Sequence, residues 1–404
     1  MSEAVLLARL RAEFGAEAVE TSADGIPRVL PRSAQAVADL CGLAFHERLR
    51  VRIEGRGTWL PPDAPADLVL STSRLGGATE IAPADLVASA GAGTSFRALQ
   101  EELAQRGVWL GLDPPGTEDR TLGSVIATGT AGPLAHGLGP VRDHLLGLEV
   151  VAGDGRMVRS GGKVVKNVAG YDLTRVQAGA FGAFGIVTAA HLRLRALPRH
   201  RIGLLARGPR DRLTRAAREL NQSGLTAAAL ELASGTPEWL LLAEFTGTRE
   251  AVEAEAERAG RSGELAWSRL ATDRLAALRD DLAGLPLAGP ITFRLGVFTD
   301  GLDETIDLLE AELGPGSVTA GAGRGSLRWS GSLPAGPRAL QSVRRTLAER
   351  EIPLTLERAP WSFRRVVGHF GEYREGVSGL VSRLREVYDP GLVFRVALDG
   401  EPVS

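Results

Sequence analysis

The stretch DPPGTEDRTLGSVIATGTAG (residues 113–132) is the most informative part of this 404-residue chain. Small residues recur through its second half, at Gly123, Ser124, Ala127, Gly129 and Gly132. Residues without large side chains let a big, flat ligand lie directly against the backbone. The stretch also shows no helical face of apolar residues. We therefore expect a looped segment that lines a binding site.

A glycine turn upstream of this stretch has the form of an anion cradle. RVRIEGRGTWL (50–60) alternates as a strand does and runs into Gly55-Arg56-Gly57-Thr58. Consecutive backbone N–H groups at such a turn, with a hydroxyl beside them, can bind a pyrophosphate. The turn fits neither the dinucleotide pattern G-x-G-x-x-G nor the G-K-[ST] of a P-loop. By itself it is either a phosphate-binding loop or an ordinary turn.

The two lysines of the chain lie together downstream, in GGKVVKNVAGYDL (161–173). They are Lys163 and Lys166 among 47 basic residues, and the rest are arginines. Because an ammonium group differs from a guanidinium in size and hydrogen-bonding geometry, a lysine kept in an arginine-rich chain indicates a specific use. We expect a polar loop that reaches into a site. The alternatives are chance clustering in a solvated loop and, for Lys166, a salt bridge to Asp172.

Several motifs in a fixed order resemble the FAD-binding domain of the vanillyl-alcohol oxidase/PCMH flavoprotein superfamily. They are PRS before a predicted helix, GRGT, DPPG, TLGSVIATGTAG, LGLEVVAGDG and GAFGAFGIVT. The block GGKVVKNVAGYDLTRVQAGAFGAFGIVTAAHLRL (161–194) resembles the family of E-type FAD-binding subunits of bacterial glycolate oxidase. Similar stretches occur in their catalytic relatives, the D-type subunits. The resemblance extends over residues 27–197 and is weaker beyond them.

The resemblance also implies which residues contact FAD. It places the pyrophosphate at Gly55, Arg56, Gly57 and Thr58, the ribityl chain and flavin along Pro115, Thr121, Leu122, Gly123, Ser124, Ala127 and Thr128, a closing turn at Gly132, and a cofactor-contacting strand at Gly185, Ile186 and Val187. Lys166 would contact the pyrimidine edge of the flavin or balance its reduced anion. Each of these glycines could instead serve a turn, and Ile186 and Val187 could be core residues.

Two departures from the family pattern affect the cofactor site. Many relatives link their flavin to a His beside the pyrophosphate loop, but EGRGTW (54–59) contains none, so FAD is expected to bind non-covalently. Many relatives also end in an N-P-G motif near the flavin, where residues 393–398 here read VFRVAL. The sequence therefore does not identify the C-terminal part of the pocket.

The pattern of elements predicts an α+β chain, whose first large part the resemblance makes a two-part PCMH-type FAD-binding domain. We expect an N-terminal helix and lead-in (1–26), the FAD-binding domain (27–197), a cap domain (198–358) and a C-terminal segment that returns to the FAD-binding domain (359–404). The cap domain should contain two split β-α-β units of the ferredoxin-like type in one sheet. Its predicted strands are 202–207, 226–233, 238–246, 291–298, 316–320, 326–331 and 353–357, and its predicted helices are 210–222, 248–260, 271–283, 302–313 and 335–349. Outside it we expect a helix at 94–106 with Thr94 as its N-cap and a short helix at 376–388.

Composition excludes several classes of protein. A net charge of −2 gives no reason to expect binding to a nucleic acid or an acidic membrane surface. The single Cys41 can form no internal disulfide and cannot hold zinc or an iron–sulfur cluster. No run of 18 apolar residues predicts a membrane span, and MSEAVLLARLRAEFG does not resemble a signal peptide. We expect a cytoplasmic location, or a peripheral one at the inner face of the membrane where partner subunits hold the chain.

Candidate acid–base residues are few. Oxidation of a 2-hydroxy acid needs a hydride acceptor, a base or metal near the hydroxyl and a cation for the carboxylate. The six His are scattered without an H-x-H or H-x-x-H pair, so we expect no metal site. His136, in a glycine-rich loop, and His369, near Arg364 and Arg365, are the candidate catalytic residues. A surface-loop His and a solvated basic edge are the alternative interpretations.

The resemblance implies an FAD-dependent oxidoreductase. The first hypothesis is the FAD-binding subunit of a glycolate oxidase-type complex. Such a complex oxidises glycolate or D-lactate to the corresponding 2-oxo acid, which for glycolate is glyoxylate. Its implied partners are a D-type catalytic flavin subunit and an F-type iron–sulfur subunit, which would supply the clusters that this chain lacks. The second is a self-sufficient single-chain FAD-dependent dehydrogenase or oxidase of hydroxy acids or alcohols. The third is a non-catalytic assembly subunit in which FAD is structural or absent.

Overall fold

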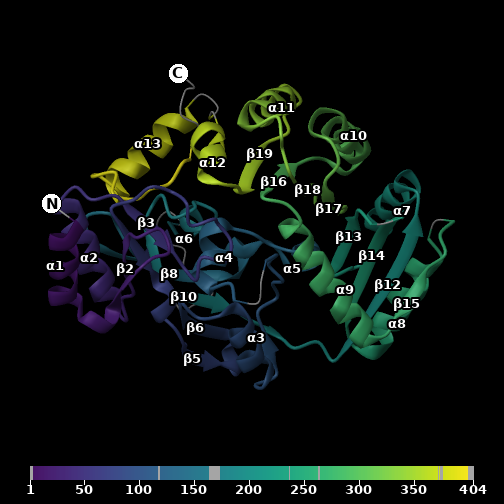
Figure 1. The fold of residues 1–404 in the computed structure, drawn as a ribbon. Coiled ribbons are helices and arrows are strands. Elements are labelled where there is room, and N and C mark those ends of the chain that lie inside the picture. Colours follow the sequence, from purple (N-terminus) through teal and green to yellow (C-terminus); the bar gives the residue numbers. More distant parts are fainter. Residues whose placement is uncertain are drawn as a thin grey trace.

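The structure, a computed structural model, describes residues 3–116, 119–162, 173–235, 237–262, 264–371, 373 and 376–398. Its strands lie in sheets of four, five, two and eight strands. Figure 1 shows the two smaller multi-stranded sheets at one side, in purple and blue, and the eight-stranded sheet at the other, in teal and green. The C-terminal helices, in yellow, return over the N-terminal part of the chain.

The first sheet carries the predicted anion-binding turn at the end of a strand. Its order is β1 (Val19–Thr21), β2 (Pro27–Val29), β4 (Leu68–Ser71) and β3 (Val51–Glu54), with β4 parallel to both β2 and β3. Helices α1 (Glu3–Phe14) and α2 (Ala34–His46) share its apolar core. The Ser33 hydroxyl caps α2 by accepting from the backbone N–H of Ala36. Because β3 ends at Glu54, residues 55–58 project beyond the carboxyl edge of the sheet.

The second sheet is antiparallel throughout. Its order is β5 (Ala78–Ala82), β6 (Val87–Gly91), β10 (Ile186–Arg193), β8 (Leu145–Val151) and β9 (Met157–Gly161). Other elements of this part are α3 (Phe96–Ala104), β7 (Val108–Trp109), α4 (Leu122–Thr128), α5 (Ala135–Leu138), α6 (Leu173–Gln177) and β11 (Arg195–Ala196), of which β7 and β11 pair with each other. Apolar residues of α3 and α4 enter the core of this sheet.

Two local predictions in this region are wrong. The hydroxyl that caps α3 belongs to Ser95, which accepts from the N–H of Ala98, whereas Thr94 donates its own hydroxyl to the carbonyl of Gly91. The second half of the 113–132 stretch is also not a loop, because residues 122–128 form the two-turn helix α4. Its buried face, Leu122, Val125 and Ile126, is too short for the periodicity to be recognised in sequence.

The eight-stranded sheet contains the two predicted β-α-β repeats, placed edge to edge. Its order is β15 (Ser268–Leu270), β12 (His200–Gly208), β14 (Trp239–Gly247), β13 (Ala229–Ala233), β17 (Ser317–Gly321), β18 (Ser326–Gly331), β16 (Ile291–Gly296) and β19 (Leu354–Arg358). The four strands of the second half lie in the mirror-image spatial order of the corresponding strands of the first half. The two halves meet where β13 pairs with β17. The predicted fold class, with its ferredoxin-like repeats, is confirmed.

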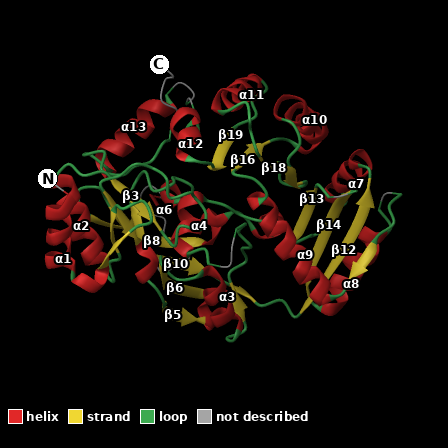
Figure 2. Cartoon of the chain, in the orientation of Figure 1, coloured by secondary structure: helices red, strands yellow, loops and turns green. Residues whose placement is uncertain are grey.

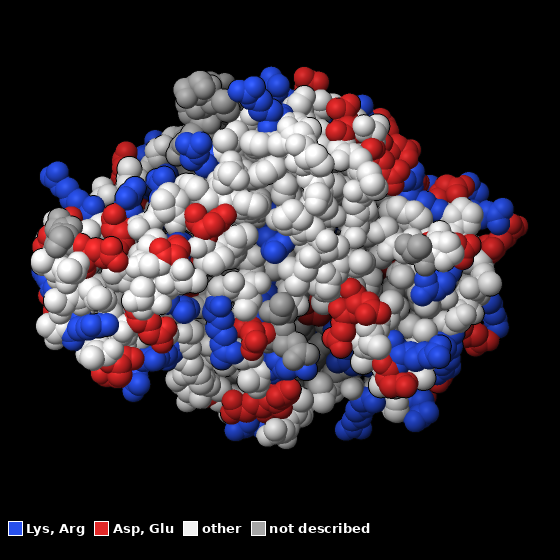
Figure 3. Space-filling model, in the orientation of Figure 1, with Lys and Arg blue, Asp and Glu red and all other residues white. Residues whose placement is uncertain are grey.

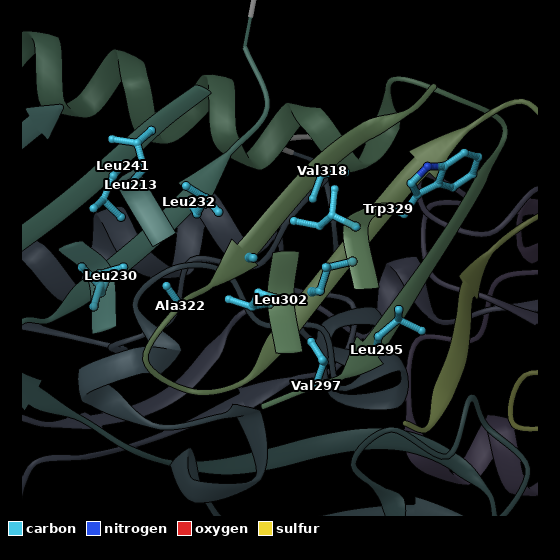
Figure 4. Packing of buried hydrophobic residues seen from close by; sticks show 14 of the residues in the cluster. Leu213, Leu230, Leu232, Leu241, Leu295, Val297, Leu302, Val318, Ala322 and Trp329 are labelled. Carbon is cyan, nitrogen blue, oxygen red and sulfur yellow. The ribbon is translucent and has the colours of Figure 1, made fainter. Parts of the chain in front are cut away.

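Four helices cover one face of this sheet, and the opposite face carries buried charged residues beside a smaller apolar cluster. Side chains of α7 (Arg210–Gln222), α8 (Arg249–Gly260), α10 (Leu302–Leu313) and α11 (Pro337–Glu349) join the sheet in one large core, part of which Figure 4 shows. In β18, Leu327 and Trp329 enter that core, so the intervening Arg328 points to the opposite face. Helix α9 (Thr272–Gly284) packs on that opposite face through Leu275 and Leu282.

The C-terminal segment crosses back to the first sheet. After α12 (Trp361–Val367) and α13 (Val377–Tyr388), the chain runs beside β3, where Phe394 bridges Val51 in parallel. The Val51 N–H donates to the carbonyl of Val393, and the Arg395 N–H donates to the carbonyl of Val51. Figure 2 shows this segment as two helices joined by loops above the N-terminal helices.

The surface carries both signs of charge. On the face in Figure 3, basic and acidic side chains are interspersed around a broad uncharged region. No helix in the described ranges is both long enough and apolar enough to cross a lipid bilayer.

Candidate functional site: a cleft at the carboxyl end of β3

A cleft of about 1000 Å³, including the open space at its mouth, lies where the glycine turn, α4 and the start of β10 meet. Many of the residues predicted to contact FAD line it. They are Gly55, Arg56, Gly57, Thr58, Gly123, Ser124, Ala127, Thr128, Gly185, Ile186 and Val187. Residues that lie far apart in the sequence therefore share one surface.

Glycines allow the walls of the cleft to approach one another. A Cβ at Gly55 would lie 2.4 Å from the Thr121 hydroxyl, and one at Gly123 would lie 2.9 Å from the Ala92 methyl group. Gly57 has a φ of +70°, which side chains disfavour, and a Cβ there would meet only open space and one Glu54 oxygen at 3.9 Å. The backbone at Gly57 is thus exposed to the cleft, as an anion cradle requires.

The remaining predicted residues lie behind the wall or outside the described part of the chain. Thr121 caps α4 by accepting from the Ser124 N–H, and Leu122 is 1% exposed in the core. A Cβ at Gly132 would lie 1.9 Å from the Asp113 carbonyl oxygen, so this glycine allows two chain segments to cross. The Pro115 carbonyl accepts from the Arg120 guanidinium at 2.5 Å. Lys166 lies outside the described residues.

The opposite wall comes from the C-terminal segment, of which the sequence had named His369 and Arg364 but neither Arg395 nor Val396. Arg364, His369, Arg395 and Val396 line the cleft together with Trp59. The Asp389 carboxylate fixes the chain segment just before Arg395 by accepting from the N–H groups of Val393 and Phe394, at 2.7 and 3.1 Å. No local pattern predicts this arrangement, because it depends on pairing with Val51, which lies much earlier in the sequence.

His369 is the one predicted catalytic candidate that reaches the cleft among the described residues. Its Nδ1 lies 2.6 Å from the Leu356 carbonyl oxygen, which can only accept, so Nδ1 carries the proton and Nε2 has a free lone pair. Burial lowers the pKa of His369 to about 3, so the ring is neutral at pH 7. Its ring stacks on Phe181, which also lines the cleft and has the unfavourable φ of +54°.

His136 lies elsewhere, at the boundary between α5 and the eight-stranded sheet. A Cβ on Gly323, in the turn between β17 and β18, would lie 2.1 Å from its Cε1. Burial lowers the pKa of His136, and its buried Nδ1 has no hydrogen-bond partner within the described ranges. The structure therefore separates the two His that the sequence proposed together.

The chemistry of the cleft fits FAD. The exposed backbone at Gly57 and the half-exposed Arg56 guanidinium suit a diphosphate, and Ser124 and Thr128 supply hydroxyls farther along the wall. Ile186 and Val187 give an apolar surface for a flat ring. A long cofactor that is anionic at its centre and aromatic at its ends matches this order of surfaces.

Comparison with known proteins agrees with this description. Residues 27–161, about a third of the chain, match the family model described as "FAD binding domain". The chain is 40% identical over 126 residues to glycolate oxidase subunit GlcE of Escherichia coli (strain K12), which is 31% of this chain and 35% of that protein. It is 33% identical over 177 residues to a D-lactate dehydrogenase of Archaeoglobus fulgidus (43% of this chain, 39% of the relative). It is 32% identical over 181 residues to glycolate oxidase subunit GlcD of Bacillus subtilis (strain 168) (44% and 38%).

A solved structure of alkyldihydroxyacetonephosphate synthase superposes with a TM-score of 0.74. It covers 98% of this chain and 85% of that chain at 14% identity, so the likeness concerns the fold alone. The aligned parts are little more than a third of the lengths of the curated relatives. Residues 27–161 are thus an FAD-binding domain with FAD as its cofactor, and the relatives that match this part of the chain are named as oxidase subunits and a dehydrogenase. The predicted family resemblance and cofactor are confirmed.

Proposed function

We propose that this chain is the FAD-carrying subunit of a glycolate oxidase-type complex, which oxidises glycolate or D-lactate to the 2-oxo acid and passes the electrons to partner subunits. The observation that carries the proposal is the 40% identity to subunit GlcE over a stretch of 126 residues, together with a cleft suited to FAD. The partners are a catalytic flavin subunit resembling GlcD and an iron–sulfur subunit. Through them the chain would lie in the cytoplasm or at the inner face of the membrane.

Each wall of the cleft has its own part in holding FAD. Residues 55–58 would bind the pyrophosphate through backbone N–H groups, and Arg56 would balance one of its charges. Ser124 and Thr128 would orient the ribityl chain by hydrogen bonds, while Ile186 and Val187 exclude water. Bound FAD supplies hydride acceptance, which none of the protein side chains can provide.

His369 limits what the isolated chain can do. Its Nε2 lone pair could accept a proton, but a pKa of about 3 makes the ring a weak base. The Leu356 carbonyl and the Phe181 ring hold the imidazole in place. This supports a division of labour, in which the substrate's proton is removed mainly in the partner subunit.

The similarity to the D-lactate dehydrogenase of Archaeoglobus fulgidus favours the second candidate function, a self-sufficient FAD-dependent dehydrogenase. Anaerobic mixing of the purified FAD-loaded chain with glycolate or D-lactate separates the two. A subunit that depends on partners keeps its yellow colour until the GlcD-like and iron–sulfur subunits are added. Rapid bleaching of the chain alone establishes the self-sufficient enzyme, and a chain that neither retains nor takes up FAD contradicts both and leaves a non-catalytic assembly role.

A further inference from the structure

A buried cation, Arg120, lies directly behind the cleft, in the segment 113–132 that the sequence singled out. The Arg120 side chain is 2% exposed and is among the largest fully buried side chains of the molecule. Its guanidinium lies over the ring of Trp59, 4.3 Å from the centroid. Trp59 itself lines the cleft.

Every hydrogen bond of this guanidinium goes to a neutral group. One terminal nitrogen donates to the Pro115 carbonyl at 2.5 Å and to the Thr130 hydroxyl at 2.8 Å. The other donates to the Thr128 hydroxyl at 2.8 Å and contacts the Ser124 hydroxyl at 3.4 Å. Thr128 and Ser124 form the cleft wall, so the charge lies one side chain away from the cleft.

No described carboxylate pairs directly with Arg120. In the described part of the chain no carboxylate lies within ion-pair distance of it, and its Nε has no hydrogen-bond partner. The carboxylate that acts on it over a longer distance is Glu357. Glu357 already accepts from Arg328 at 2.6 Å and from Arg294 at 2.9 Å, so its charge is shared with two nearer guanidinium groups.

A buried cation without a counter-charge is costly, and an anion placed beside it would offset part of that cost. Burial lowers the pKa of Arg120 to about 9, which still leaves it charged at pH 7. Its two terminal nitrogens already donate to protein groups and its unpaired Nε is buried, so the guanidinium is not placed to bind a substrate carboxylate directly. What it offers to the cleft is a fixed positive charge shielded from water.

We propose that Arg120 is a positioning residue that stabilises the negative charge which FAD acquires on reduction. The proposal rests on FAD occupying the cleft described above. The ring system of bound FAD would carry one negative charge after uptake of two electrons and one proton. The positive charge of Arg120 acts electrostatically across the side chains of Ser124 and Thr128. It stabilises the anionic reduced state relative to the neutral oxidised state. The sequence had suggested Lys166 for this role.

The test compares midpoint potentials of bound FAD in Arg120→Met, Arg120→Lys and the unmodified chain. Arg120→Met removes the charge and keeps a side chain that can pack on Trp59. The ratio of its affinity for reduced FAD to its affinity for oxidised FAD should be at least tenfold lower than in the unmodified chain. A tenfold change in this ratio lowers the two-electron midpoint potential by about 30 mV. Arg120→Lys should recover much of the loss. The matched control is Arg201→Met, because Arg201 also lies over a tryptophan, 4.5 Å from the Trp109 ring, but away from the cleft.

The unmodified chain provides a measurement that does not depend on any variant folding. Its bound FAD should have a more positive potential than free FAD, and an equal or lower potential overturns the proposal. Equal weakening of oxidised and reduced FAD in Arg120→Met, with an unchanged potential, also overturns it and assigns Arg120 to the structure of the site alone. Failure of the unmodified chain to bind FAD would instead contradict the proposed function.

Discussion

The imidazole of His369 lies stacked on the ring of Phe181, with ring centroids 3.8 Å apart and planes 15° from parallel. Phe181 belongs to the glycine-rich stretch before β10, and His369 follows the last strand of the eight-stranded sheet. The stack thus joins two walls of the cleft that are formed by distant parts of the chain.

Phe181→Ala should lower the free energy of unfolding by about 3 kcal/mol, because it removes a buried aromatic ring and leaves a cavity beside His369. Chemical denaturation of the FAD-free protein measures the change. The control is Phe298→Ala, since Phe298 is 87% exposed and its loss should alter stability by less than about 0.5 kcal/mol. Equal effects of the two substitutions would show that the stack does not stabilise the fold.

Gly57→Val should abolish FAD retention. Valine is strained at a φ of +70°, and its side chain would occupy the space through which the backbone meets the pyrophosphate. FAD released by acid precipitation is the measurement. Gly42→Ala is the control, because Gly42 lies inside α2 with free space around it and should keep full FAD content. Normal FAD content in Gly57→Val would mean that the phosphate site lies elsewhere.

The stability of the chain should fall as the pH drops below 6.5, in part because of His369. The unfolded chain takes up a proton near pH 6.5, whereas the pKa of about 3 in the folded state delays that uptake. The stabilisation by neutral His369 is present above pH 6.5 and is lost as the pH falls toward 3. Denaturation at pH 7.5, 6 and 5 should give a shallower pH dependence for His369→Gln than for the unmodified chain, and parallel curves would contradict the assignment.

Glu231→Gln should stabilise the chain at pH 8 and leave its stability unchanged near pH 4. Burial within the eight-stranded sheet raises the pKa of Glu231 to about 7. The folded state holds the proton while the unfolded state has lost it, so stability falls as the pH rises from 4.5 through 7. The gain at pH 8 is up to about 3 kcal/mol.

The matched control for Glu231 is Glu253→Gln. Glu253 forms an exposed ion pair with Arg269 at 2.6 Å, so its loss should change stability far less than the loss of the buried Glu231 charge, and by a similar amount at both pH values. Thermal denaturation at the two pH values compares both variants. A Glu231→Gln variant that is less stable at pH 8 would show that the carboxylate is paired in the native state.

Local sequence was a good guide wherever neighbouring residues determine the conformation. Helix α7 spans the predicted residues 210–222 and α10 the predicted 302–313, because each has an apolar stripe long enough to show its period. The prediction of Thr94 as the N-cap of α3 was wrong, because the neighbouring Ser95 also has a hydroxyl that can cap the helix. The two roles differ only because the Thr94 hydroxyl donates to the Gly91 carbonyl.

The order of several glycine-containing motifs along the chain was enough for a resemblance to an FAD-binding domain, because close backbone approach and positive φ favour glycine at fixed places in such motifs. They could not reveal that Arg120 is buried with no carboxylate of the described residues within ion-pair distance, that His369 faces Phe181, or that Arg395 and Val396 line the cleft. Those features depend on which segments meet after folding. Burial and charge balance are properties of the assembled surroundings, and only the three-dimensional packing assigns them to particular residues.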